Sequence, residues 1–586
     1  MIKVTDIQNW QWPPVFSSTG EQKRLAQKFN ISPLIIHLLE MRNISGNDEI
    51  DRFLNPSLAS LPDPSTMNGM DTAVSLVLKT IKAHAEIVIW GDYDVDGITA
   101  TCLLVKFFKK IGIHARWYIP DRFTEGYGLN SKGIEKIRSD IQTDCPLLIT
   151  VDCGISNHTE IQKAKELGFN VIVTDHHEPP EDSVKADAIL NVKQECCKFI
   201  TQDIAGVGTA FYLAAGIRSR LHSERYFKNT DETPNLKLFL DLVAIGTIAD
   251  MVPLSWVNRI LVKAGFEVLS ASSNIGISAL LRSSDIGAGT MTSDDIAFQI
   301  APKINAAGRM GKVDTAMELL LCDDENTACR LANRLTDLNS KRKKICKNIL
   351  ESTLDIHHNR LIFNNNCIIL SGDFHQGVIG IVASQLANRY NLPVILFAHD
   401  TSKYGKKVLK GSGRSISGVN LVNVLRQCDR FLLKFGGHTM AAGMSLFEEN
   451  FEIFRGRFSE VLEEEMVNKQ KSDQYTIDAE FSIDQLFEEK VVEQLYRLEP
   501  YGVGNKRPVF SDPTAYIYDC YSVGHNGDHL KLFFRCKYSN RQGMGFNLGH
   551  HRELLQEQSV HRVIYSPVLN RYKNTVAWEV RLFDIF

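Results

Sequence analysis

Apolar runs alternate with segments of helical periodicity between residues 70 and 200. Each run is short, which is typical of a buried strand, and the segments between them have the apolar period of a helix. The runs occupy residues 87–90, 115–119, 147–151, 170–174 and 188–192. This alternation predicts a parallel sheet with helices on both faces, and therefore an α/β fold class.

The rest of the chain predicts two further units and a helix between them. Residues 235–255 are apolar and helical in pattern, with Asp250 alone near their end. From Asp324 to about residue 356 an apolar stripe continues without glycine or proline, which indicates one long helix bridging two domains. A smaller α/β unit with glycine-rich loops follows, then a charged linker at 463–472. Later β-patterned segments indicate a small barrel; they lie at 514–524, 529–538, 561–569 and 575–585.

A chain of 586 residues is long enough for about three or four domains. We expect a division into five parts. These are an N-terminal segment at 1–60, the larger α/β domain at 61–323, a connecting helix at 324–360, the smaller α/β domain at 361–468 and the barrel at 469–586.

Composition narrows the class of protein. The hydrophobic content of 44% and charged content of 23% are those of an ordinary globular chain, and the net charge of −3 shows no global basic excess. A basic face on one domain could still be hidden by an acidic cluster elsewhere. The 12 cysteines form no CxxC pair, and their one close pair is Cys196-Cys197, which favours a reducing compartment. With neither a signal pattern nor a long uncharged apolar run, we expect a cytoplasmic protein that does not bind membranes.

Acidic and imidazole side chains follow three of the predicted strands. Asp92, Asp94 and Asp96 come at alternate positions after the first run, Asp152 follows the third, and Asp175-His176-His177 follows the fourth. The carboxyl ends of parallel strands meet at one edge of a sheet, which is where ligands gather. Because like charges repel, such a cluster is best explained by hard cations that neutralise it. The sequence therefore predicts one metal site at this edge.

Two simpler interpretations of these motifs are possible. Residues 92–97 fit the first positions of an EF-hand calcium loop, but its last position would be Leu103 instead of Glu, and a strand precedes it in place of a helix. Asp175-His176-His177 alone could be an ordinary strand-to-helix turn capped by Asp175. Three clusters at strand ends favour the metal site over both.

The ligand types indicate the chemistry. Carboxylates suit Mg²⁺ or Mn²⁺, and an imidazole shifts the preference toward Mn²⁺. Two such ions, about 3.5–4 Å apart, can activate a water and offset charge on a phosphate ester. No GxxxxGK[ST] motif occurs, so we do not expect an NTP-driven motor.

Glycine-rich segments later in the chain carry polar or cationic side chains. They lie at 375–380, 411–415 and 436–438, and Asn305–Arg309 offers a further candidate. Glycine permits close backbone approach, and Arg or His can then hold a phosphate oxygen. Each could instead be a turn with a solvated cation. The run Lys341–Lys344 is either a solvated helix face or a patch that tracks a nucleic-acid backbone.

These motifs resemble those of the DHH phosphoesterases. The matching segments are DYDVDG at 92–97, DCG at 152–154, DHH at 175–177, and Asp250; the GSGRS and GGH segments are similar to the DHH-associated second domain, DHHA1. With FLNP at 53–56, APKINAAGR at 301–309 and LEPYGVGN at 498–505, residues from about 30 to 586 resemble the bacterial single-strand-specific exonucleases of this superfamily. The resemblance implies a DHH domain, a DHHA1 domain and a C-terminal OB-fold barrel.

The resemblance also implies site residues. Asp94, Asp96, Asp152, His176 and Asp250 would bind two Mn²⁺ or Mg²⁺ ions, with Asp92 and His177 as catalytic residues. The residues expected to bind DNA phosphates are Asn305, Arg309, His375, Ser412, Arg414, Gly436, Gly437 and His438. Candidates for base stacking on the barrel are Tyr516, Tyr518, Phe533 and Phe534. Lys303 stands where the family pattern would have Arg, which puts a bidentate phosphate contact there in doubt.

The function implied by the resemblance is 5′→3′ degradation of single-stranded DNA to 5′-mononucleotides in DNA repair, including mismatch repair, and recombination. The enzyme is expected to be a monomer that acts near the bacterial nucleoid, with single-strand-binding protein and a RecQ-like helicase as partners. A phosphoesterase for small substrates, such as pyrophosphate or cyclic dinucleotides, has no use for the additional barrel. An inactive DNA-binding scaffold would lack metal ligands, whereas every ligand position here is filled.

Overall fold

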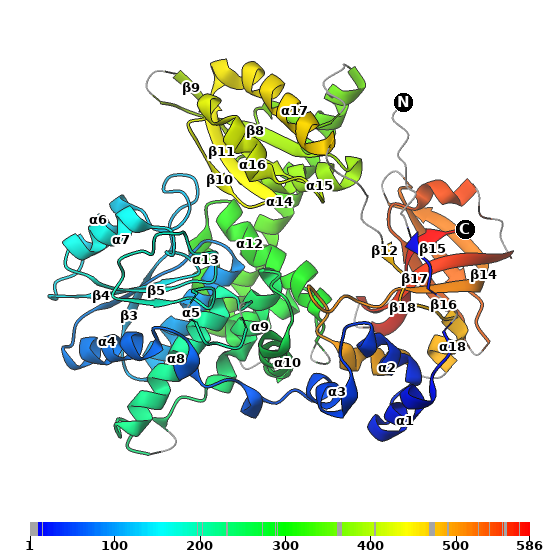
Figure 1. Cartoon of the computed structure of the whole chain (residues 1–586), viewed down its shortest axis with the longest axis horizontal. Coiled ribbons are helices and arrows are strands. Elements are labelled where there is room, and N and C mark those ends of the chain that lie inside the picture. Colours follow the sequence, from blue (N-terminus) through cyan, green and yellow to red (C-terminus); the bar gives the residue numbers. More distant parts are fainter. Residues whose placement is uncertain are drawn as a thin grey trace.

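The computed structural model describes residues 10–13, 16–195, 197–201, 203–229, 232–271, 274–287, 289, 291–359, 366–403, 406–467, 475–488, 491–524, 527–537, 539–553, 555, 559–572 and 575–586. Cys196 lies outside these ranges, and so do residues 468–474, which include part of the expected linker. Three bodies are arranged around the centre of the molecule: a large α/β domain, a smaller α/β domain above it in Figure 1, and a barrel at the right.

The large domain is built on a parallel sheet with the strand order β3-β2-β4-β5-β6. Its strands are β2 (Ile87–Trp90), β3 (Ala115–Tyr118), β4 (Leu147–Val151), β5 (Asn170–Thr174) and β6 (Ala188–Leu190). All neighbouring pairs are parallel, as the alternating pattern predicts.

Helices cover both faces of this sheet because alternate strand residues point to opposite sides. Ile87 and Ile89 pack with one set of helices, and Val88 and Trp90 with the other. The first set is α4 (Met70–Lys82), α5 (Val95–Lys110) and α8 (Gly206–Ser223); the second is α6 (Ser131–Ser139) and α7 (His158–Glu166). The predicted α/β fold class is confirmed.

A helical layer completes the large domain and leads into the second. It comprises α9 (Leu240–Ala249), α10 (Trp256–Ala271), α11 (Ile275–Arg282), the π-helix η5 (Asp295–Ile300), α12 (Ala301–Arg309) and α13 (Val313–Leu321). The expected long helix is present as α14 (Glu325–Asn359). Its first half packs on α11, α12 and α13, and its second half reaches α15 of the smaller domain. One rigid element therefore spans both domains.

The smaller domain has a mixed sheet with the order β10-β11-β9-β8-β7. Its elements are β7 (Ile368–Gly372), α15 (Ile379–Tyr390), β8 (Val394–Lys403), β9 (Lys406–Arg414), α16 (Leu421–Gln427), β10 (Lys434–Gly437), β11 (Ala441–Phe447) and α17 (Phe451–Val467). Gly411–Arg414 and Gly436–Gly437 lie within strands, although we expected loops. The glycines let neighbours approach: a Cβ at Gly411 would lie 2.5 Å from the Phe397 ring.

The C-terminal strands close into the expected barrel. Their order is β13-β14-β15-β16-β18-β17, and an additional pairing of β14 with β17 joins the ends. The strands are β13 (Ala479–Glu480), β14 (Phe510–Val523), β15 (His529–Phe534), β16 (Arg541–Gly545), β17 (Ser559–Tyr572) and β18 (Thr575–Ile585), with helices α18 (Ile483–Glu488) and α19 (Val491–Leu495). The sequence pattern missed β16, a short strand that contains two glycines.

The N-terminal helices belong to the barrel and not to the large domain that follows them in sequence. They are α1 (Gly20–Phe29), α2 (Pro33–Glu40) and α3 (Gly46–Leu54). Leu34, Leu38 and Ile50 share one hydrophobic core with barrel residues such as Phe510 and Tyr565. At the other end of this module, β1 (Trp10–Gln11) pairs in parallel with β12 (Tyr475–Thr476).

Among the described residues, no single helix combines the length and apolar composition of a membrane span; the bent pair α10 and α11 reaches them only when the two are taken together.

Candidate metal centre and phosphate-binding pocket

The turn between β2 and α5 carries the first three carboxylates. Asp94 caps α5, and its Oδ1 accepts hydrogen bonds from the backbone amides of Asp96 (2.9 Å) and Gly97 (3.1 Å). A Cβ at Gly97 would lie 2.6 Å from the backbone of Asp92, so glycine is required for this tight turn. The helix cap thereby turns three carboxylates of like charge toward the edge of the sheet.

Asp96 reaches across to a second helix. Its carboxylate accepts hydrogen bonds from the amides of Gly206 (2.6 Å) and Val207 (2.8 Å), which begin α8. The positive end of that helix stabilises the charge. Burial and the charge of Asp94 act in the opposite direction and raise the pKa of Asp96 to about 7.

His176 lies at the centre of the remaining ligands. Its Nε2 is 3.1 Å from Asp152 Oδ1, 3.5 Å from Asp250 Oδ2 and 3.9 Å from Asp96 Oδ2. These three carboxylates come from three separate elements, the ends of β4 and α9 and the start of α5. Burial, with the nearby charge of His177, lowers the pKa of His176 to about 3, so the imidazole is neutral, as a metal ligand must be.

The donor set fits a hard divalent cation. Buried atoms Asp92 Oδ1, Asp152 Oδ1 and His176 Nε2 have no hydrogen-bond partner in the described part of the chain. Burial, together with neighbouring carboxylates, raises the pKa of Asp92 and Asp152 well above the usual range and that of Asp250 to about 9. Without counter-charge this arrangement is unfavourable, and cations would relieve it.

The ligand atoms form three overlapping triads, each within 4.8 Å. One contains Asp96, His176 and Asp250, a second contains Asp92, Asp94 and Asp152, and a third joins Asp152 to His176 and His177. The structure therefore brings together the seven residues that the resemblance names as metal ligands or catalytic residues. Asp152 and His176 each belong to two of the triads.

Asp175 has a different role from its neighbours. Its carboxylate accepts hydrogen bonds from the amides of Ile155, His176 and His177 and lies 2.7 Å from His177 Nδ1. Burial opposes the charged imidazole, but this contact and the surrounding carboxylates raise the pKa of His177 to about 9. The other ring nitrogen, Nε2, lies 3.5 Å from the hydroxyl of Tyr127. The sequence analysis treated Asp175 as a motif residue only and did not identify Tyr127.

A cluster of guanidinium groups adjoins the carboxylates. Arg309 donates to Gly377 O (3.3 Å) and Arg414 to Gly413 O (2.8 Å); neither forms an ion pair with a described carboxylate. Burial and the charges of Arg122, Arg342 and Arg414 lower the pKa of Arg309 to about 10. Burial and Arg122 also lower the pKa of Arg414. Half-buried cations that repel one another define a site for an anion.

Tyr93 connects the two clusters. It stands between Asp92 and Asp94, its ring lies 5.0 Å from the Arg122 guanidinium, and a Cβ at Gly308 would lie 2.3 Å from its carbonyl. Arg122 was not identified from sequence because no motif marks it. Arg342, from the ambiguous run on α14, also belongs to this cluster: its buried Nε has no partner in the described part of the chain.

The other residues expected at phosphates occupy different positions. His375 contacts Phe123 edge to face, with ring centroids 5.6 Å apart, and Ser412 accepts from Arg414. Asn305 lies half-buried on α12, one turn before Arg309. Gly436 pairs with Gly443, which pairs with Ser412, so the GGH segment lies two strands from Arg414. Gly437 and His438 are exposed at the end of β10.

The structure agrees with the doubt about a phosphate contact at Lys303 and corrects the stacking candidate Phe534. Lys303 is buried and donates to Ser283 O (2.7 Å) and Ser284 Oγ (2.8 Å), so it fastens α12 to the end of α11 instead of facing the arginine cluster. Phe534 lies inside the barrel, because even positions of β15 point inward. Tyr516, Tyr518 and Phe533 are partly exposed on the outside.

Comparisons with known proteins agree with this architecture. Family models match at residues 86–247 (DHH family, N-terminal domain), 364–464 (DHHA1 domain) and 477–584 (RecJ OB domain). The chain is 33% identical to the single-stranded-DNA-specific exonuclease RecJ of Bacillus subtilis, over 94% of this chain and 68% of that protein. It is 36% identical to the protein of the same name from Haemophilus influenzae, over 86% of this chain and 87% of that one.

Solved structures show the same likeness. RecJ from Thermus thermophilus in complex with Mn²⁺ matches with a TM-score of 0.79 and 28% identity, over 99% of this chain and 80% of that one. The complex of the same protein with Mg²⁺ matches with a TM-score of 0.73 and 27% identity, over 98% and 78% of the two chains. From the matched domains and the identity along most of its length, the chain belongs to the RecJ family of single-stranded-DNA-specific exonucleases.

Proposed function

We propose that this chain is a metal-dependent exonuclease that degrades single-stranded DNA in the 5′→3′ direction and releases 5′-mononucleotides. The proposal rests mainly on one observation: two sites of opposite charge lie next to each other. A largely buried cluster of carboxylates with free ligand atoms adjoins a half-buried cluster of arginines without carboxylate partners among the described residues. Cations satisfy the first and a phosphate satisfies the second, so the pair is suited to a phosphodiester.

The metal cofactor is two ions of Mn²⁺ or Mg²⁺. Asp96, His176 and Asp250 would hold one ion, and Asp92 and Asp94 the other. Asp152 could contribute to both, since it forms a triad with Asp92 and Asp94 and also lies 3.1 Å from His176 Nε2. Bound ions of this type supply Lewis-acid stabilisation of phosphate charge and lower the pKa of water. The solved RecJ structures with Mn²⁺ and Mg²⁺ support the choice of metal.

His177 is placed to hold a proton at the reacting phosphate. Asp175 fixes its ring through Nδ1, so that Nε2 is directed outward, toward Tyr127. With its raised pKa the imidazole is protonated at neutral pH. In that form it can donate a hydrogen bond to a phosphate oxygen or a proton to the leaving oxygen.

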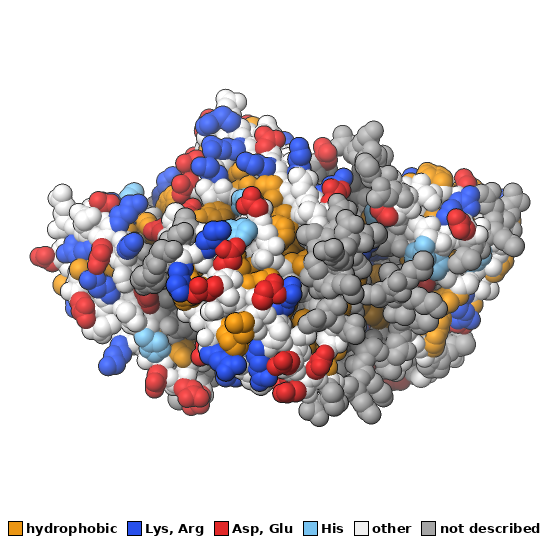
Figure 2. Space-filling view, turned by 90° about the horizontal axis from the view of Figure 1, so that it is seen from above, with side chains coloured by type: hydrophobic (Ala, Val, Ile, Leu, Met, Phe, Trp, Pro, Cys, Tyr) orange, Lys and Arg blue, Asp and Glu red, His pale blue; other side chains and the backbone are white. Residues whose placement is uncertain are grey.

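The arginine cluster provides a reason for the direction of digestion. A terminal phosphate carries more negative charge than an internal one, and Arg309, Arg414 and Arg122 concentrate positive charge in one pocket. If the 5′-terminal phosphate is held there, the next phosphate lies at the metal centre, and hydrolysis releases a 5′-mononucleotide. On the face shown in Figure 2, basic and acidic side chains are interspersed, so the part of that face that the structure describes has no broad positive patch to compete for the strand.

The outside of the barrel can hold the rest of the strand. Tyr521, Lys531, Met544 and Arg581 are neighbours across four strands by register. Cations lie over rings on this face: Lys531 is 5.6 Å from the Phe533 centroid, and Arg581 is 5.6 Å from that of Phe546. Base stacking and backbone contacts of this kind bind single strands without sequence preference.

The cellular context follows from the family. We place the enzyme in the bacterial cytoplasm, in repair and recombination, with single-strand-binding protein and a RecQ-like helicase as partners of a monomer. Co-purification of the chain with each partner on gapped DNA tests this part separately from the chemistry.

The direct test is a time course on end-labelled oligonucleotides. Purified protein with Mn²⁺ should release labelled mononucleotide at once from 5′-labelled single strands, and only late from 3′-labelled ones. Chelator should stop the reaction, and matched duplex should resist it. Early release from the 3′ end would reverse the assigned polarity, equal rates on duplex would remove the strand specificity, and activity in chelator would overturn the metal assignment.

A further inference from the structure

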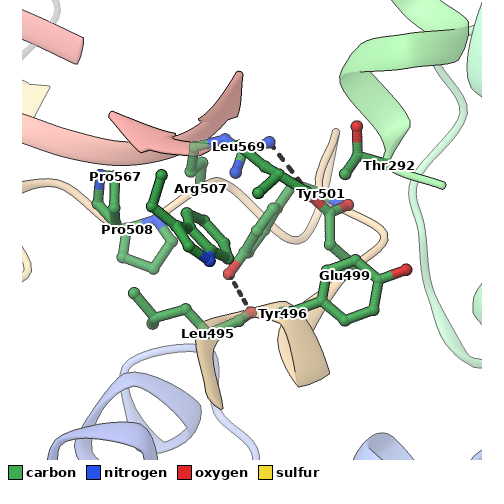
Figure 3. A pocket seen from close by; sticks show the side chains of 10 residues that line it. Thr292, Leu495, Tyr496, Glu499, Tyr501, Arg507, Pro508, Pro567 and Leu569 are labelled. Atoms are coloured by element: carbon green, nitrogen blue, oxygen red, sulfur yellow. Dashed lines mark hydrogen bonds and ion pairs between the residues drawn. The ribbon is translucent and has the colours of Figure 1, made fainter. Parts of the chain in front are cut away.

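The segment at residues 496–507 joins the barrel to the large domain, and its residues Leu498, Glu499, Pro500, Tyr501 and Asn505 are buried. It begins with η8 (Tyr496–Leu498) and contains the LEPYGVGN motif. No residue of this motif has a role in the catalytic mechanism proposed above. Figure 3 shows the small cavity at its centre, where Thr292 of the large domain faces Glu499, Tyr501 and Arg507. Pro567 and Leu569 of the barrel strand β17 line the opposite side.

Arg259 of α10 is the main contact on the large-domain side. Only 2% of this residue is exposed. Its guanidinium donates to three backbone carbonyls, Leu498 O (2.9 Å), Arg497 O (3.1 Å) and Phe53 O (2.9 Å), and lies 3.6 Å from the centroid of the Phe53 ring. One side chain thus holds together the large domain, the segment before the barrel and the N-terminal helix α3. The donors of the planar guanidinium have fixed directions, so these hydrogen bonds fix the orientation of the segment relative to the large domain. Apolar packing alone would allow the two to slide past each other.

Further polar contacts repeat this connection. Lys263, one turn along α10, donates to Arg497 O and Glu499 O. The buried Glu499 carboxylate accepts from Ser293 Oγ (2.7 Å) and from Arg507 (3.2 Å), and Arg507 also pairs with Asp294 (3.1 Å). A buried ion pair gives little net stability, but it is specific for one geometry.

The same segment touches the loop that carries a metal ligand. The amide of Leu254, four residues after Asp250, donates to Val503 O (2.8 Å). A Cβ at Gly502 would lie 2.8 Å from Leu254 Cδ1, so the two segments are in close contact. Asn258 holds the other side of this loop by donating to Pro253 O (2.8 Å). The Asp250 loop is therefore fixed between α10 and the segment that leads into the barrel.

The N-terminal helices complete the joint. Arg42 donates to Asn505 Oδ1 (3.0 Å) and to Lys506 O (2.6 Å), while Asn505 Nδ2 donates to Leu498 O and Pro500 O. Asn505 is thus a hub that keeps the turn at 500–505 in one conformation.

We infer that this joint sets the position of the barrel relative to the metal centre, and that Arg259 is a positioning residue for strands long enough to touch both. The inference rests on the proposed function. With the barrel held in register, nucleotides bound on its surface raise the effective concentration of the strand end at the Asp250 loop. A loosened joint would lose this advantage while leaving the metal ligands in place.

The test compares two substrate lengths in the Arg259→Met variant. A dinucleotide reaches only the metal centre, whereas a strand of about 20 nucleotides also covers the barrel. We expect wild-type kcat/KM on the dinucleotide and a loss of about tenfold on the long strand, mainly through KM. A loss by the same factor at both lengths, or no loss on the long strand, would overturn the inference, because general destabilisation lowers the active fraction equally for every substrate.

Two further variants keep the test independent of folding. Lys263→Met and Ser293→Ala each remove weaker contacts of the same joint and should show the same length-dependent pattern to a smaller degree. Arg220→Met, which removes a surface arginine paired with Asp71, is the matched control and should behave as wild type at both lengths. If wild-type protein cleaves neither substrate, the proposed function fails first, and this outcome is seen before any variant is compared.

Discussion

The acidic edge of the parallel sheet and the arginine cluster beside it both hold several like charges close together, negative in the first and positive in the second. Within each cluster the like charges repel one another, and each leaves a buried polar atom without a hydrogen-bond partner among the described residues, Asp92 Oδ1 in the first and Arg342 Nε in the second. They differ in how their positions are fixed. The carboxylates are held by strand ends and helix caps of a single domain, whereas the arginines come from both domains and from the helix between them. The metal site should therefore be rigid, and the phosphate site sensitive to the domain arrangement.

The largest effect is expected at Asp152, which belongs to one triad with Asp92 and Asp94 and to another with His176. Asp152→Asn keeps the size of the side chain but removes one negative charge from both proposed cation positions, so the hydrolysis rate should fall by about a thousandfold. Initial rates on single-stranded DNA measure this effect. Binding of the strand, followed by fluorescence anisotropy, should change little, and a parallel loss of binding would show that the two sites are not separable.

Removing charge from the arginine cluster should act on binding instead. Arg309→Met should raise KM for strands with a 5′-phosphate by about tenfold to a hundredfold, the value of one or two charge-assisted hydrogen bonds. Strands with a 5′-hydroxyl should be affected less. Steady-state kinetics on the two substrates give the ratio. Equal effects on both would mean that Arg309 contacts an internal phosphate.

The acidic cluster should also make stability depend on pH when metal is absent. The pKa of Asp96 is raised to about 7 and that of Asp250 to about 9, from a usual value of 3.8. The folded chain then keeps protons that the unfolded chain has lost. The stability from these groups is therefore full below pH 3.8, declines as the pH rises above that value, and is lost above about 7 for Asp96 and about 9 for Asp250. Bound Mn²⁺ cancels this penalty. The difference in Tm between Mn²⁺-loaded and chelator-treated protein should widen with pH, and a constant difference would contradict the assignment.

The smallest effect is expected at Lys303, which the structure places outside both clusters. Lys303→Met breaks hydrogen bonds to Ser283 and Ser284, so the free energy of unfolding should fall by about 1 kcal/mol. KM and kcat should remain those of the wild type. Denaturant unfolding measures the first quantity and nuclease assays the second, and a raised KM would show that Lys303 does contribute to phosphate binding.

The two clusters also differ in how well they could be predicted from sequence: the acidic cluster was predicted almost fully, and the arginine cluster only in part. The five strands of the large sheet and the acids after them could be predicted because strand period and strand ends are local features. Arg122 and Tyr127 could not, since they lie in a loop without a motif and acquire their role only through contacts with Tyr93 and His177. Phe534 was misjudged for a similar reason: residue type indicates chemistry, but the direction of a side chain depends on its packing.

The shared core of α1–α3 and the barrel has a consequence for how the protein is made. These helices leave the ribosome before either α/β domain, yet the strands that cover Leu34 and Ile50 are synthesised after both. Their apolar faces therefore stay exposed, or bound by a chaperone, until the barrel strands have been synthesised. Folding of the nuclease is thus completed only when its first helices pack against its last strands. A ribosome that stalls before the barrel is made would leave these helices unpaired and prone to aggregate, beside two folded domains.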